Sequence, residues 1–167
     1  MTPATEADLA TMAEQLGRPM RDVVGIAARC VCGRPTVVAT KPRLSDGTPF
    51  PTFYYLTHPA ASAAASRLEA SGRMADYTAM LIDELGASYA AAHDAFLADR
   101  LAHGDVPEIA GISAGGMPTR VKCLHALIAH SLAAGGGVNP IGDLALAECG
   151  WSPEVCACAP SPTAVDE

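Results

Sequence analysis

The sequence predicts an α+β fold, in which a small N-terminal antiparallel sheet of about three strands packs on a mainly helical C-terminal part. Runs rich in β-branched and aromatic residues lie within the first 57 residues. After them, apolar residues recur at helical spacing, and alanine, a good helix former, supplies much of the hydrophobic half of the composition. We expect one globular domain over residues 1–151 and a weakly ordered tail with three prolines over residues 152–167.

The predicted strands are short runs of apolar, β-branched or aromatic residues at 23–29, 35–40 and 52–57. A helix is expected at residues 5–16, because Thr5 suits the N-cap, Asp8 stands three residues on and Gly17 can end the helix. Apolar spacing predicts later helices at 59–68, 74–85, 89–101 and 141–149, and one from Pro118 to about Ala133. Between them, residues 104–117 read as a glycine-rich loop.

The charge and composition exclude several classes of protein. A net charge of -7 and a pI near 5.1 argue against nucleic-acid binding, which needs a surplus of Lys and Arg. No apolar run approaches the ~20 residues of a spanning helix, and acidic rather than basic residues stand near the N-terminus. We therefore expect a cytoplasmic protein without membrane contact. In a reducing compartment, the six cysteines favour metal binding, catalysis or burial over disulfides.

The first candidate site is a set of metal ligands. Cys30 and Cys32 stand on a predicted turn before Gly33, where two alternate thiolates can reach one metal, and His58 ends the third predicted strand. The proposed ligands are Cys30, Cys32, His58 and Cys123, a Cys₃His set typical of a closed structural zinc site. An iron–sulfur cluster is the alternative. Plain burial competes with both, because free cysteine often acts as a small hydrophobe. Cys149, Cys156 and Cys158 form a second, weaker group in the proline-containing tail.

Helical geometry selects Cys123 from the predicted helix that begins at Pro118. On a regular helix, Cys123 and His125 would diverge by ~200°, and Cys123 and His130 would lie roughly 10 Å apart. Neither histidine should therefore share a metal ion with Cys123.

The second candidate site is the glycine-rich entry to that helix. Flexible glycines precede a helix N-terminus, where free N–H groups attract anions, and basic side chains follow. The proposed anion- or ligand-binding residues are Ser113, Gly115, Gly116, Arg120, Lys122, His125 and His130. The order of residues is not that of a P-loop, and an ordinary loop with solvated bases is the competing interpretation.

Four segments carry a resemblance to a known bacterial family. They are RCVCGRP at 29–35, PRLSDGTPFPTFYYLT at 42–57, GMPTRVKCLH at 116–125 and GVNPIGD at 137–143. Over roughly residues 8–148, the chain resembles the "domain of unknown function 501" family, which has no established activity and whose genes often stand near those of an exopolyphosphatase and a septum-formation protein. Members usually have cysteine at the position of His58. The resemblance therefore implies a metal site with four cysteines in the common form and Cys₃His here, since both residue types bind zinc.

These observations leave three functions open. The preferred one is a non-catalytic, zinc-stabilised adaptor or regulatory domain, which would have a protein partner. The second is an enzyme that acts on a phosphorylated or anionic small molecule; it requires a concave pocket joining Arg120, Cys123 and either His125 or His130. The third is an iron–sulfur or redox protein. The oligomeric state does not follow from the sequence.

Overall fold

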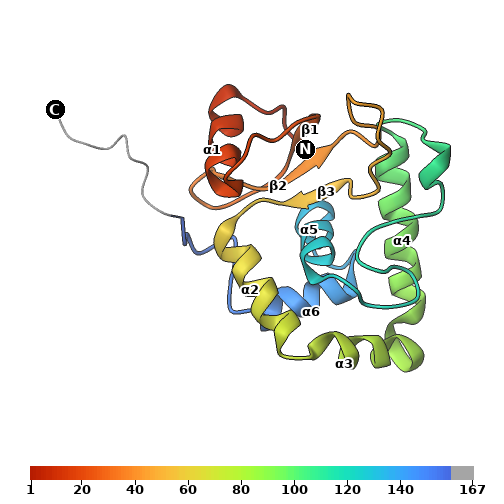
Figure 1. The fold of residues 1–167 in the computed structure, drawn as a ribbon. Coiled ribbons are helices and arrows are strands. Elements are labelled where there is room, and N and C mark those ends of the chain that lie inside the picture. The colour runs from red at the N-terminus through yellow and green to blue at the C-terminus, as the bar shows by residue number, and fades with distance from the viewer. Residues whose placement is uncertain (159–167) are drawn as a thin grey trace.

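The computed structural model describes residues 1–158 and has the predicted α+β architecture, with a three-stranded sheet and a mainly helical remainder (Figure 1). Helix α1 lies on one side of the sheet, and helices α2 to α6 lie on the other. In the described part of the chain, no helix combines the length and the apolar character needed to cross a membrane.

The sheet consists of β1 (Val23–Arg29), β2 (Pro35–Thr40) and β3 (Tyr54–Leu56), paired antiparallel in that order. The first two strands have the predicted bounds, and the third is shorter than predicted. Strand β2 is buried along its whole length because both of its faces are covered. Val37 and Ala39 belong to the main core, whereas Val38 packs with Met12 and Ile26 beneath α1.

Helix α1 (Glu6–Leu16) begins and ends as predicted. Thr5 and Asp8 form a reciprocal capping box, and Gly17 adopts a left-handed conformation after the last turn. The Asp8 carboxylate also binds the guanidinium of Arg29 on β1 at 2.7 Å. This hydrogen-bonded pair holds the pKa of Asp8 well below its usual range and fastens α1 to the sheet.

Most of the remaining chain is helical. The elements are α2 (Pro59–Ala70), α3 (Arg73–Met80), a π-helical turn η1 (Leu81–Leu85), α4 (Gly86–Leu101), a 3₁₀ turn η2 (Pro107–Ile109), α5 (Leu124–Ala134) and α6 (Pro140–Glu148). Pro59 and Pro140 each occupy a first-turn position of their helix, where the missing N–H costs nothing.

Helix α5 lies at the centre of the helical part and packs on β3, α2 and α6. Leu124, Leu127 and Ile128 on α5 are fully or almost fully buried. Helix α6 approaches α5 closely at Gly142, where a Cβ atom would collide with the Leu127 carbonyl oxygen. The glycine is therefore required by packing.

The prediction of a helix beginning at Pro118 is wrong, because α5 begins six residues later. The backbone of residues 120–123 bonds instead to other parts of the fold. Tyr89 Oη donates to the Arg120 carbonyl at 3.1 Å, and the Val121 N–H donates to Thr78 Oγ1 at 3.1 Å. The Gly115 carbonyl accepts the N–H groups of Lys122 and Cys123. These tertiary hydrogen bonds take the place of the helical ladder.

Candidate functional site

The first pair of clustered cysteines stands on the tight connection between β1 and β2. The Gly33 N–H donates to the Cys30 carbonyl at 2.8 Å, and the Cys30 N–H donates to the Arg34 carbonyl at 2.9 Å. Gly33 has a φ of 86°, which favours glycine, so the residue fits the sharp reversal after Cys32. The turn brings the sulfur atoms of Cys30 and Cys32 to one side.

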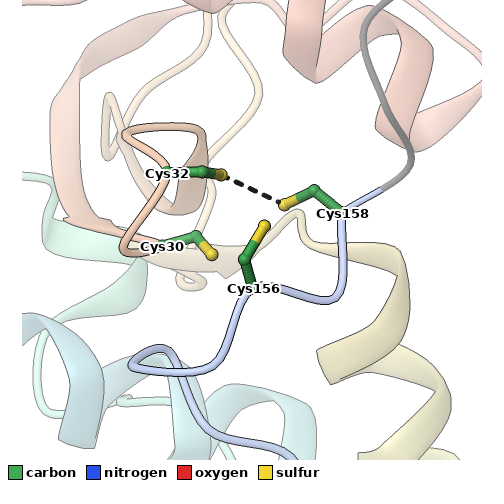
Figure 2. Close-up of side chains that lie close together, drawn as sticks. All are labelled: Cys30, Cys32, Cys156 and Cys158. Atoms are coloured by element: carbon green, nitrogen blue, oxygen red, sulfur yellow. Dashed lines mark hydrogen bonds between the residues drawn. The ribbon is translucent and has the colours of Figure 1, made fainter.

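The second pair comes from the segment after α6. Trp151 is buried beside His58, with ring centroids 5.2 Å apart. The Val31 N–H then donates to the Pro153 carbonyl at 2.9 Å, which fixes this segment against the β1–β2 turn. Cys156 and Cys158 follow and face the first pair (Figure 2).

The sulfur atoms of Cys30, Cys32, Cys156 and Cys158 all lie within 4.8 Å of one another. Cys32 Sγ and Cys158 Sγ are 3.5 Å apart. Four thiolates around a tetrahedral zinc ion, each with a Zn–S bond of about 2.3 Å, would be separated by about 3.8 Å. The cluster therefore has the composition and the approximate spacing of a four-thiolate metal site. All six cysteines of the chain are free thiols.

The thiols of this cluster differ in how readily they ionise. Burial raises the pKa of Cys30, and burial together with hydrogen bonding to Cys32 raises the pKa of Cys158. By contrast, the pKa of Cys32 falls to about 7, mainly because the Arg34 backbone N–H donates to its sulfur. Neighbouring thiolates repel one another, and a divalent cation at their centre would remove that repulsion and keep them deprotonated.

His58 borders the cluster and is oriented by α2. Its Nδ1 accepts the Ala61 N–H at 3.4 Å as the N-cap of that helix, which leaves the ring proton on Nε2. Nε2 lies 3.1 Å from Cys158 Sγ and can donate to it. Burial, aided by the charge of Arg34, lowers the pKa of His58 and favours this neutral form. The geometry suits a histidine that supports a ligand sulfur.

Cys123 lies in a different group from the other residues of the predicted Cys₃His set. The structure brings Cys30 and Cys32 together and places His58 beside them, but the remaining two sulfurs come from Cys156 and Cys158. The sequence holds one signal for this outcome, because Cys156-Ala-Cys158 repeats the spacing of Cys30-Val-Cys32. Because the prolines of the tail predict weak order, the repeated spacing was not recognised as a second pair of ligands. Residues 159–167 of the predicted tail lie outside the described part of the chain.

Cys123 instead joins Glu69 and His125, whose ligand atoms lie within 4.8 Å of its sulfur and could also hold a metal ion. The prediction that Cys123 and His125 diverge is wrong because Cys123 is the extended N-cap of α5 and not a helical residue. His125 Nδ1 is 3.1 Å from the Glu69 carboxylate, and Nε2 is 3.1 Å from the Ser62 carbonyl. The Cys123 sulfur and then Glu69 raise the pKa of His125 to about 9 against the effect of burial.

A cavity of about 1160 Å³ opens beside this second group. It lies between β3, α2 and residues 111–123, with the end of α1 at one margin. Six of the seven residues that the sequence proposes for anion or ligand binding line it: Ser113, Gly115, Gly116, Arg120, Lys122 and His125. The concave pocket required for the small-molecule hypothesis, joining Arg120, Cys123 and His125, is therefore present.

The seventh residue, His130, is a core residue and does not line this cavity. It is fully buried, stacks on Tyr54 at 5.9 Å and meets the ring of Phe96 edge-on. Its Nδ1 lies 3.1 Å from the Asn139 side-chain amide, and burial lowers its pKa to about 4. His130 is thus a neutral packing residue, because the register of α5 turns it away from the cavity.

Comparison with known families gives one match. The profile of the family described as "Protein of unknown function (DUF501)" matches residues 26–147. This range contains Cys30, Cys32 and Cys123 but ends before Cys156 and Cys158. No curated protein and no solved structure matches the chain. Because the matched range covers most of the sequence, the chain belongs to this family.

Proposed function

We propose that this member of the DUF501 family is a zinc-stabilised adaptor or regulatory domain whose metal is bound by Cys30, Cys32, Cys156 and Cys158. One observation carries the proposal: the four sulfur atoms, drawn from two distant parts of the chain, lie within 4.8 Å of one another. Thiolates are the ligands of closed structural zinc sites. A site with four protein ligands leaves no open position for a substrate, which favours a non-catalytic role.

The proposed centre would hold the end of the domain in place. Its ligands stand in two pairs, and Cys32 and Cys158 are 126 residues apart in sequence. A cross-link of that span removes much conformational entropy from the unfolded chain, by analogy with a long-range disulfide. The metal would keep residues 149–158 against the β1–β2 turn, next to the buried Trp151 and His58.

His58 takes a supporting role in this proposal and is not a ligand. A donor at Nε2 stabilises negative charge on Cys158 Sγ, as residues around metal ligands commonly do. This role differs from the Cys₃His arrangement expected from the sequence. It also leaves Cys123 free for the cavity.

Metal analysis of anaerobically purified full-length protein tests the proposal. The wild type should contain one zinc ion per chain. Cys30→Ser, Cys32→Ser, Cys156→Ser and Cys158→Ser should each lower the metal content, whereas Cys123→Ser and Cys149→Ser, the matched controls, should retain it.

Three results would contradict the zinc assignment. The first is wild-type protein without stoichiometric metal. The second is a brown protein that contains iron and sulfide, which would identify an iron–sulfur cluster. The third is loss of zinc in Cys123→Ser with retention in Cys156→Ser and Cys158→Ser, which would restore the Cys₃His set.

A further inference from the structure

The large cavity has a charge opposite to that of the whole chain. The protein contains 18 acidic and 11 basic residues, yet no Asp or Glu is among the described residues that line the cavity. Its lining includes the cationic side chains of Arg120 and Lys122, together with His125. A cavity of this kind in an acidic protein is suited to a negatively charged ligand.

Arg120 and Lys122 provide the positive charge of the cavity lining. Over residues 1–158, neither side chain forms a hydrogen bond or an ion pair. Three other arginines, by contrast, have acidic partners: Arg29 pairs with Asp8, Arg43 with Glu108 and Arg73 with Glu148. His125 already faces Glu69, so it adds little net charge.

Backbone hydrogen bonds fix the path of the segment that carries these two cations. Residues 115–123 fold into a compact turn in which the Gly115 carbonyl accepts the Lys122 N–H at 2.7 Å. Gly116 has a φ of 97°, and a Cβ atom there would lie 2.6 Å from the Arg120 carbonyl oxygen. The glycines are therefore needed for the path of the chain that presents Arg120 and Lys122.

The rest of the lining is suited to a polar organic molecule. Six other residues of the lining carry hydroxyl groups: Thr52, Thr57, Ser62, Ser66, Ser113 and Thr119. The volume of about 1160 Å³ exceeds what an inorganic anion needs and lies just above the range of about 300–1,000 Å³ that is typical of small-molecule and cofactor pockets.

We propose that this cavity binds a phosphorylated small molecule, with Arg120 and Lys122 contacting the phosphate and the hydroxyl-bearing wall contacting its organic part. Two unpaired cations match the double negative charge of a phosphate monoester better than a single carboxylate. The arginine fork can contact two phosphate oxygens, and the lysine adds a point charge. The inference is independent of the zinc centre, because the two sites share no residue.

Calorimetric titration of the full chain as purified tests this inference. The probes are inorganic phosphate, glucose 6-phosphate and AMP, compared with glucose, adenosine, sulfate and citrate. At least one phosphate compound should bind with a stoichiometry of one, and the matched compounds without phosphate should bind more weakly. In Arg120→Gln/Lys122→Gln, affinity should fall by about tenfold or more, because charge-assisted hydrogen bonds are lost.

The control variant is Arg21→Gln/Lys41→Gln, which removes the same charge away from the cavity and should leave the affinity within about twofold of wild type. The inference is overturned if none of the three phosphate probes binds the wild type. It is also overturned if sulfate or citrate binds as tightly as the phosphate probes, or if the control variant loses as much affinity as the cavity variant.

Alkylation of Cys123 gives a second readout that does not require a high-affinity ligand. Iodoacetate is an anion and iodoacetamide is neutral, so cations in the cavity should favour iodoacetate at Cys123 relative to Cys149, which does not line the cavity. Peptide mass spectrometry measures both rates. Phosphate should protect Cys123, and Arg120→Gln/Lys122→Gln should abolish the preference. Equal preferences at Cys123 and Cys149 in the wild type would contradict a cationic cavity.

Discussion

At the residue scale, the surroundings of two histidines favour opposite charge states of the imidazole ring. His58 is buried, uses Nδ1 to cap α2 and presents Nε2 to Cys158. His125 faces the Glu69 carboxylate on one side and the Ser62 carbonyl on the other, which suits an imidazolium that donates from both nitrogens. One ring is therefore expected to be neutral and the other charged at neutral pH.

Replacement of His58 distinguishes a supporting residue from a ligand. His58→Ala should retain one zinc ion per chain but weaken zinc affinity by about 10- to 100-fold, because the donor to Cys158 Sγ is lost while four thiolates remain. Competition with a chromophoric chelator measures that affinity. Complete loss of zinc from His58→Ala, with zinc retained by Cys158→Ser, would show that His58 is itself a ligand.

His125 should titrate near pH 9, and both Cys123→Ser and Glu69→Gln should lower its pKa. The folded protein holds this proton more tightly than the unfolded chain does. The contribution of protonated His125 to the stability of the fold is therefore complete below about pH 6.5 and is lost as the pH rises through about 9. NMR of the imidazole protons measures the shift, with Glu84→Gln as a control. An unchanged His125 pKa in both variants would contradict the assigned contacts.

At the element scale, local signals predict some elements closely and miss others for a physical reason. The Thr5–Asp8 capping box and the bounds of β1 and β2 follow from residues that are adjacent in sequence. The start of α5 could not be predicted in this way. The backbone of residues 120–123 forms hydrogen bonds with Thr78, Tyr89 and Gly115, and residue spacing does not identify these partners. The same displacement of the helix start brings Cys123 and His125 together.

Packing of α6 on α5 can be tested at Gly142. Gly142→Ala should reduce the free energy of unfolding by about 1–3 kcal/mol, because its Cβ would meet the Leu127 carbonyl and the two helices would have to separate. Gly136→Ala is the matched control, since a Cβ atom there has no neighbour within 4 Å. Urea denaturation compares the two variants, and equal stabilities would contradict the close approach.

At the scale of the whole molecule, the two candidate sites are built from different segments of the chain. The cysteine cluster joins the sheet to the segment after α6, and the cationic cavity lies between the sheet, α2 and the turn before α5. The six cavity residues proposed from the sequence lie between Ser113 and His125, so their pattern could be recognised there. The two cysteine pairs are separated by more than 120 residues, and only the folded chain shows that they meet.

Removal of the metal should destabilise the whole domain. If zinc links Cys32 to Cys158 across most of the chain, a strong chelator should lower the thermal unfolding midpoint by about 10 °C or more. The same chelator should have little effect on Cys156→Ser/Cys158→Ser. A midpoint that chelation leaves unchanged in the wild type would mean that no structural metal is present.

Zinc K-edge X-ray absorption of the metal-loaded wild-type protein tests the proposed four-thiolate centre most directly. Four sulfur scatterers at about 2.3 Å and no nitrogen scatterer are expected around the metal. Three sulfurs with one imidazole nitrogen, or a shell dominated by light atoms, would contradict the four-thiolate centre.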